Sequence, residues 1–186
     1  MNTGLHEWMV RRRSIAGRIA AALACGYGLL LVGAAAWSRV DVTHVPCPTG
    51  STSVLVDTEA RVLCLCRDGR VEGTFRVALG RGGKDKRREG DGRTPTGWYD
   101  LGEPRASRRY HLFIPVAFPT LEQRRAGLSG SDVGVHGPHI AFAWLRHATV
   151  WVDWTRGCVA VGTRSEAEEI AAWVRANGKN TPIWLK

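Results

Sequence analysis

Short apolar runs bounded by turn residues recur between residues 54 and 185, and this pattern predicts a series of strands. Asp68-Gly69 separates two of these runs and is typical of a two-residue hairpin turn. The predicted strands are Val54–Val56, Arg61–Cys66, Val71–Leu79, Trp98–Leu101, Tyr110–Pro115, Val133–Val135 and Pro182–Leu185, and Val159–Val161 is a further short apolar stretch.

Helical spacing is clear in one place, near the carboxyl end. Ser165 and Glu168 match a capping box, and Gly178 supplies a left-handed stop. The apolar stripe between them is Ile170, Trp173 and Val174. A short helix is also expected at Leu121–Ala126. Strands outnumber helices and do not alternate with long helices, so we predict a mainly β fold with few helices and not a doubly wound parallel sheet.

The amino-terminal sequence has the features of an export signal or membrane anchor. Ile19–Trp37 is an uncharged apolar run of 19 residues, and four arginines precede it, Arg11, Arg12, Arg13 and Arg18. At about 1.5 Å per residue the run is just long enough to cross a bilayer of roughly 30 Å, and the arginines favour the cytoplasmic side. Ala34-Ala35-Ala36 also offers a cleavage site. We expect an exported, periplasmic or extracytoplasmic protein, either anchored in the membrane through residues 19–37 or processed at about residue 36. A buried core helix is the less favoured alternative.

Three segments follow from these patterns: a basic stub with a signal anchor or signal peptide at 1–38, a linker at 39–52 and a globular domain at 53–186. The formal net charge is +9. No nucleic-acid-binding motif accompanies it, so we expect no nucleic-acid partner. Residues 80–96 form a polar, glycine-containing loop, and its basic run, Lys84–Arg88, is interpreted as a solvated loop tip. Attraction of this run to an anionic polymer is the alternative.

The five cysteines are Cys25, Cys47, Cys64, Cys66 and Cys158. Cys64 and Cys66 lie two apart on a predicted strand and would share one face. We favour small buried apolar roles for both, and a bridge from Cys47 to either one is the alternative. The chain has no C-x-x-C pair, so a structural zinc site is not expected. His136 and His139 are a less favoured metal-ligand pair, because Pro138 between them breaks a helix and so disfavours one shared face.

Cys158 and His136 are the candidate reactive pair. Each is next to a glycine, as Gly157-Cys158 and His136-Gly137, and together they supply a thiol nucleophile and a base. A free thiol has a pKa of about 8.5, and an adjacent imidazolium or oriented amide dipoles can make the thiolate its resting form. An inert buried thiol and a structural core histidine are the alternatives.

Three blocks of sequence resemble the L,D-transpeptidase catalytic domain family of the YkuD type (ErfK/YbiS/YcfS/YnhG-like). They are Val77–Gly80 with Arg88–Tyr99, then Val135-His136-Gly137, then Asp153–Val161. The resemblance covers roughly residues 53–186 and implies a β-sandwich catalytic domain. It also implies acyl transfer on peptidoglycan stem peptides through a thioester, with no metal or organic cofactor.

In this resemblance Cys158 matches the nucleophile and His136 matches the base. Gly137 matches the element whose carbonyl orients the imidazole, and Thr155 matches the Ser/Thr position of the cysteine motif. Amides near Gly157 and Cys158 are candidate oxyanion-hole donors. Further candidate roles are a substrate-carboxylate contact for Arg156, a groove wall or packing for Trp154, and a structural ion pair, favoured over a catalytic role, for Asp153.

The chain departs from the family pattern at two positions. The family commonly has His at the position of Arg156, and Arg or Asn at the position of Ala160. The leading hypothesis is an exported, monomeric L,D-transpeptidase that acts on peptidoglycan. One alternative is a peptidoglycan L,D-peptide hydrolase, which the short Ala160 side chain suggests. The other is a non-catalytic wall-binding module.

Overall fold

The computed structural model describes residues 47–178 and 180–186. The predicted signal or anchor at 1–38 and most of the predicted linker lie outside this range. Within it, no helix is long and apolar enough to span a membrane.

One nine-stranded sheet dominates the fold, in the order β4-β9-β1-β2-β3-β8-β7-β6-β5. The predicted strands are all present, with small shifts of their ends; β5 is additional, and the apolar stretch Val159–Val161 is strand β8. The bounds are β1 Thr52–Asp57, β2 Val62–Arg67, β3 Arg70–Ala78, β4 Gly97–Leu101, β5 Arg105–Ser107, β6 His111–Pro115, β7 Gly134–His136, β8 Val159–Val161 and β9 Thr181–Leu185.

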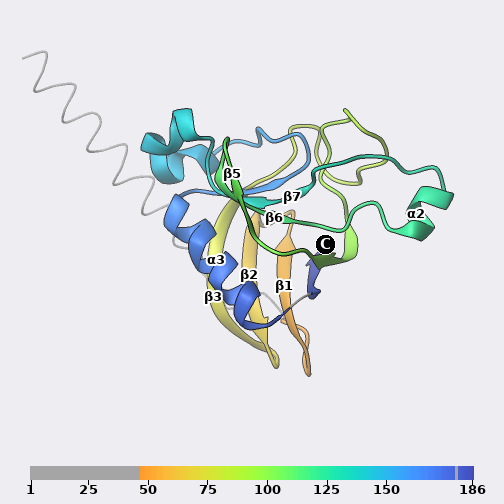
Figure 1. Cartoon of the computed structure of the whole chain (residues 1–186), viewed down its shortest axis with the longest axis horizontal. Coiled ribbons are helices and arrows are strands. Elements are labelled where there is room, and N and C mark those ends of the chain that lie inside the picture. The colour runs from red at the N-terminus through yellow and green to blue at the C-terminus, as the bar shows by residue number, and fades with distance from the viewer. Residues whose placement is uncertain (1–46, 179) are drawn as a thin grey trace, which may run out of the picture.

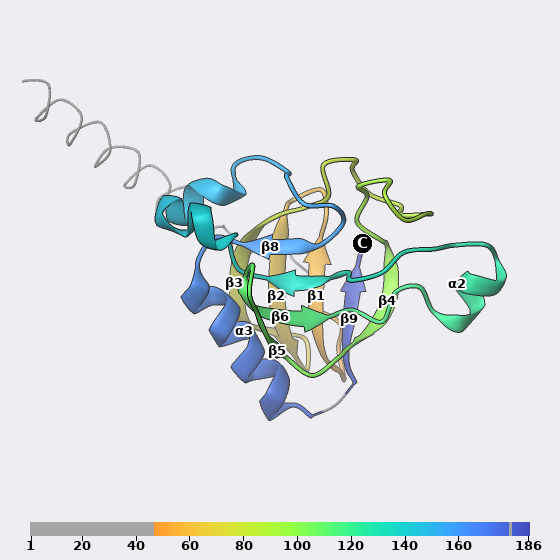
Figure 2. The same cartoon turned by 45° about the horizontal axis from the view of Figure 1, so that its top comes forward.

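The sheet curls on itself. Most of β3 pairs with β2, but its last two residues, Val77 and Ala78, pair with β8 and carry the sheet into its second half. Leu101 at the end of β4 bridges Val116 just after β6, which brings the two ends of the sheet together. Figure 2 shows β6 and β8 running across the direction of β1, β2 and β9. The two facing layers expected of a sandwich are therefore halves of one curled sheet.

The main core lies inside this curl and includes apolar side chains from both halves of the sheet. Helix α3 (Arg164–Ala176) adds Ala167, Ile170, Ala171 and Val174 to it. Figure 1 shows α3 along one side of the sheet and the short helix α2 (Leu121–Arg125) projecting on the other.

The predicted cap of α3 is wrong by two residues. Thr163 is the N-cap: its hydroxyl accepts the Glu166 amide at 3.2 Å, and the Glu166 carboxylate accepts the Thr163 amide at 2.9 Å. Ser165 lies in the first turn instead. Thr163 and Ser165 are each followed three residues later by a glutamate, so the motif alone does not separate the two positions. Gly178 has a φ of +86° and ends the helix as predicted.

The preferred interpretation of the cysteines is wrong for Cys66 and right for Cys64. Cys66 forms a disulfide with Cys47, whereas Cys64 is a fully buried free thiol. Both side chains lie on the same face of β2, in a small apolar cluster outside the main core. The bridge fastens the end of the predicted linker to the sheet.

A 3₁₀ segment, η1 (Ile140–Val150), was not predicted. It joins the two parallel strands β7 and β8 through the chain that leads to Cys158. In it and just after it, five large apolar side chains are exposed: Ile140, Phe142, Trp144, Trp151 and Val152.

Candidate active site

Strand register places the predicted base on the outer face of the curled sheet. His136 pairs with Phe113 on β6 and with Ala160 on β8, and Ala160 pairs in turn with Ala78 on β3. Paired residues of neighbouring strands share a face, while the residues between them point the other way. Val135 and Val159 accordingly enter the core. One face of the sheet thus packs on the core, and its other face, which carries His136, forms the floor of the candidate site.

A cavity of about 670 Å³ opens over this floor. It brings together five of the predicted site residues, Cys158, His136, Thr155, Arg156 and Trp154. Gly137 and Gly157 lie immediately behind the lining, where they act through their backbones.

Cys158 is half-buried at the start of β8. Its Sγ donates a hydrogen bond to the backbone oxygen of Asp132 at 3.3 Å. Burial raises the pKa of Cys158 to about 11, although the Gly134 amide and the Lys86 ammonium act in the opposite direction. The resting sulfur is therefore a neutral thiol in this structure.

His136 is almost fully buried, and the Gly137 carbonyl orients it. Nδ1 donates to this carbonyl oxygen at 2.6 Å, which leaves the basic lone pair on Nε2. The ring stacks on Tyr110 with centroids 3.8 Å apart. Burial lowers the pKa of His136 to about 4, so the imidazole is neutral at pH 7. This geometry fits the role expected of Gly137.

The pair therefore rests as thiol and neutral imidazole. Neither an imidazolium nor amide dipoles make the thiolate the resting form here, because burial disfavours the charged form of both groups. The thiol proton is held on the Asp132 carbonyl and not on His136. Nucleophilic attack would require that proton to move to Nε2 as the new bond forms, which is general-base catalysis.

Thr155 fixes the turn that presents Cys158. Its hydroxyl accepts the Gly157 amide at 3.1 Å and donates to the Cys158 carbonyl at 2.7 Å. The Gly157 amide is thus already engaged, which removes it from the candidate oxyanion-hole donors and leaves the Cys158 amide. Gly157 has a φ of +128°, and a Cβ there would lie 2.4 Å from the Arg93 carbonyl oxygen. The turn therefore requires glycine at this position.

Trp154 both packs and walls the cavity. Its Nε1 donates to the Thr149 carbonyl at 2.9 Å, and its ring meets His136 edge-on at 5.8 Å. It also packs on a small cluster that contains Ala160. Ala160 is fully buried and does not line the cavity. Ala160 therefore packs beside His136 and lies outside the cavity lining.

The flanking charged residues have separate roles. Asp153 is structural, as favoured: it pairs with Arg61 at 2.7 Å and accepts the Leu79 amide at 2.9 Å. Arg156 is exposed at the cavity and is free to meet an anionic ligand. His139 lines the cavity but caps η1, because its Nδ1 accepts the Ala141 amide at 3.2 Å.

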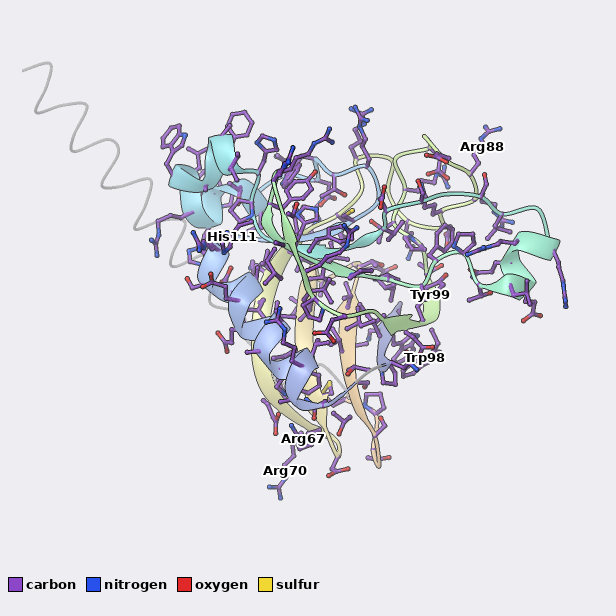
Figure 3. All side chains as sticks on the ribbon, viewed as in Figure 1. Arg67, Arg70, Arg88, Trp98, Tyr99 and His111 are labelled. Atoms are coloured by element: carbon purple, nitrogen blue, oxygen red, sulfur yellow. A yellow bond between two sulfur atoms is a disulfide. The ribbon has the colours of Figure 1, made fainter. Side chains whose placement is uncertain are left out.

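Lys86 and Tyr110 belong to the cavity and were not predicted. Tyr110 was predicted only as part of a strand, because no sequence pattern indicates that its ring stacks on His136. The interpretation of Lys84–Arg88 as a solvated tip is wrong for Lys86, whose side chain is only 3% exposed and pairs with Asp91. Asp85, Arg87 and Arg88 of the same loop are exposed as expected, and Figure 3 shows Arg88 projecting outward.

The fold and the site define a mainly β domain with a cysteine and an oriented histidine in one open cavity. The family model for the L,D-transpeptidase catalytic domain (YkuD) matches residues 51–184. The chain belongs to this family, as its three sequence blocks indicated.

Solved structures share the fold at low sequence identity. The helical cell shape determining protein Pgp2 from Campylobacter jejuni is 21% identical with a TM-score of 0.61, covering 86% of this chain and 55% of that one. Bd1075 from Bdellovibrio bacteriovorus is 23% identical with a TM-score of 0.51, covering 80% and 50%. L,D-transpeptidase 3 from Mycobacterium tuberculosis is 12% identical with a TM-score of 0.50, covering 73% and 61%. The chain thus spans about half the length of the first two proteins. No curated protein matches it.

Proposed function

We propose that this protein is an exported cysteine acyl transferase that acts on peptidoglycan stem peptides through a thioester on Cys158. The observation that carries the proposal is the position of Cys158 and His136 in one open cavity, with Nδ1 of His136 held by the Gly137 carbonyl. Membership of the L,D-transpeptidase catalytic domain family supports the substrate class.

The chemistry follows from the neutral pair. The Cys158 thiol passes its proton to Nε2 of His136 as the sulfur attacks the stem-peptide carbonyl. The tetrahedral oxyanion receives a hydrogen bond from the Cys158 amide. When the C–N bond breaks, His136 returns the proton to the departing amine, and an acyl thioester remains. An amine of a second stem then attacks the thioester, its proton passes to His136, and the sulfur leaves to be protonated again.

Export is part of the proposal. The apolar run at 19–37 would place the domain outside the cytoplasm, anchored or cleaved, where an anionic wall polymer meets a chain of net charge +9. The Cys47–Cys66 disulfide supports this location, since such bridges persist in oxidising compartments. A monomer is sufficient for the site, because every group named above comes from one chain.

The test is Cys158→Ala, with Cys64→Ala as the matched control because Cys64 is the other free cysteine of the described residues. We expect Cys158→Ala to lower stem-peptide turnover at least about a thousandfold, as removal of a nucleophile does. Cys64→Ala should stay within a few-fold of the parent. Mass spectrometry of tetrapeptide stems measures the products, and unchanged turnover in Cys158→Ala would falsify the nucleophile assignment.

The same assay decides between transfer and hydrolysis. With an excess of amine acceptor, a transferase gives an acceptor adduct whose yield rises with acceptor concentration. A hydrolase gives cleaved stem without any adduct, and that result would overturn transfer while retaining the thioester step.

A further inference from the structure

Among the lysine, arginine, histidine, aspartate and glutamate side chains that the structure describes, Lys86 and His136 are the buried ones, and His136 is neutral. It lines the same cavity as Cys158. Other charged or titratable groups around that cavity are exposed or half-exposed and thus screened by water: Glu89, Arg105, Arg109, Asp132, His139 and Arg156. The charge of Lys86 is the least screened in the site.

The structure holds this ammonium firmly in place. Nζ donates to Asp91 Oδ1 at 2.8 Å and to the Arg88 carbonyl at 3.2 Å. Asp91 in turn accepts backbone amides, those of Arg87 at 2.8 Å and of Arg88 and Arg93 at 3.0 Å. Burial alone would raise the pKa of Asp91, but the Arg88 amide, the Lys86 ammonium and the other amides lower it well below its usual range. Asp91 is therefore a permanent anion that fixes the position of Lys86.

Lys86 lies against the cysteine turn. A Cβ built on Gly157, the residue before Cys158, would be 3.6 Å from Nζ. On another side, a Cβ on Gly130 would be 2.8 Å from Cε of Lys86. Because Gly130 and Gly157 have no side chains, the Lys86 side chain can pack between the 80–96 loop, the 129–133 segment and the turn that carries Cys158.

We propose that Lys86 is a positioning residue that stabilises the anion formed on Cys158, with Asp91 attenuating its charge. The adjacent imidazole is neutral and does not supply this charge before proton transfer. The Lys86 ammonium favours the Cys158 thiolate, whereas Asp132 disfavours it. The inference rests on the proposed nucleophile, and its test reads the ionisation of the thiol and not turnover of peptidoglycan.

The experiment measures alkylation of Cys158 by iodoacetamide between pH 7 and pH 9.5, with the modified peptide identified by mass spectrometry. Only thiolate reacts, so below the thiol pKa the rate at each pH reports the ionised fraction. The variants are Lys86→Met, which removes the charge, and Asp91→Asn, which removes the attenuating anion. Lys84→Met is the control, because Lys84 lies two residues away and pairs with Glu59 at the surface.

We expect Lys86→Met to slow alkylation about tenfold at every pH, the effect of a one-unit rise in pKa. Asp91→Asn should accelerate alkylation severalfold, Lys84→Met should match the parent, and Lys86→Arg should restore most of the rate. A merely structural role predicts another pattern: both Lys86→Met and Asp91→Asn would loosen the loops, expose the thiol and accelerate alkylation.

Opposite signs for Lys86→Met and Asp91→Asn therefore support the inference, and shifts of the same sign overturn it. Parent-like alkylation of Lys86→Met overturns it as well. If Lys86→Met does not fold, Lys86→Gln replaces it, because an amide can still donate to Asp91 without carrying a charge. Slower alkylation of Lys86→Gln supports the inference, and parent-like or faster alkylation overturns it. If the alkylation test fails while Cys158→Ala is inactive, only the role of Lys86 is overturned. If Cys158→Ala stays active, the proposed function itself is overturned.

Discussion

Gly157 is the residue at which the cysteine turn tolerates no side chain. Its φ of +128° disfavours L-residues, and its Cα faces the Arg93 carbonyl so closely that a Cβ would be 2.4 Å from the oxygen. Backbone on both sides of this contact is held by other bonds, including that from the Gly157 amide to Thr155. The close approach joins the 80–96 loop to the turn that carries the nucleophile.

We predict that Gly157→Ala destabilises the protein and disables the site. Gly127→Ala is the matched control, because Gly127 also has a positive φ, +83°, but has no atom within 4 Å of the added Cβ. The control should lose about 1 kcal/mol of unfolding free energy from backbone strain. Gly157→Ala should lose about 1–3 kcal/mol more and at least about tenfold in turnover. Urea unfolding and stem-peptide assays measure both, and equal losses in the two variants would contradict the steric account.

Individual site residues differed in how far sequence could predict them. The placement of Cys158 and His136 in one cavity, with the Gly137 carbonyl on the imidazole, was predictable because these residues lie within short motifs. Lys86 was not, because its burial depends on two distant glycines, Gly130 and Gly157, that make room for it. The resting ionisation of the pair could not be predicted either, since burial decides it and residue type does not.

At the scale of elements, α3 follows the cysteine strand and packs against β6 and β8, so its first turn fixes the chain just beyond the site. The cap at Thr163 is a reciprocal pair of side-chain and backbone bonds with Glu166. Glu166 also meets His147 of η1 at 3.0 Å. The start of the helix thereby connects η1 to the end of β8.

Alanine substitutions separate the observed cap from the predicted one. We predict that Thr163→Ala lowers the free energy of unfolding by about 1 kcal/mol, because it leaves a helix amide without its acceptor. Ser165→Ala should leave stability almost unchanged or slightly higher, since alanine is the better helix former in the first turn. Urea unfolding at pH 7 is the measurement. A larger loss of unfolding free energy in Ser165→Ala than in Thr163→Ala would instead support Ser165 as the N-cap.

Most of the elements that the sequence predicted bury apolar side chains, although the short helix α2 buries none. Strands β1 and β2 follow from short apolar runs bounded by turn residues, and the stripe of α3 follows from helical spacing. Strand β5 has three partly exposed residues and shows no such pattern. Segment η1 carries exposed aromatic and aliphatic residues, so its pattern indicated no buried face. The Cys47–Cys66 bridge left no sequence signal that could separate Cys66 from Cys64, because both share a face of β2.

At the scale of the whole molecule, the site depends on a parallel pairing that short-range patterns do not specify. Strands β7 and β8 are adjacent and parallel, so the chain must cross from the end of one to the start of the other. The crossover contains η1 and Trp154, which together cover His136 and Ala160. This connection covers one side of the site, and the sequence indicated only the class of fold.

Burial of both reactive groups makes the stability of the whole molecule depend on pH. His136 has a pKa of about 4 when folded and an ordinary value near 6.5 when unfolded. Between these values the unfolded chain binds a proton that the folded chain refuses, so stability falls as pH drops from about 6.5 to about 4. Cys158 acts at the other end: its pKa rises from 9.0 to about 11 on folding, so stability falls as pH rises above about 9.

We therefore predict a plateau of unfolding free energy between about pH 6.5 and pH 9, with an acid limb to which His136 contributes up to about 3 kcal/mol. His136→Gln should be less stable on the plateau but show a shallower slope between pH 6.5 and pH 4. Cys158→Ala should flatten the alkaline limb alone. Carboxylates such as Asp91, and the other histidines, are present in every variant and cancel in the comparison. Parallel acid limbs in the parent and in His136→Gln, measured by urea unfolding, would contradict the lowered pKa of His136 and would show that the imidazole is hydrated and not sealed in the wall of the cavity.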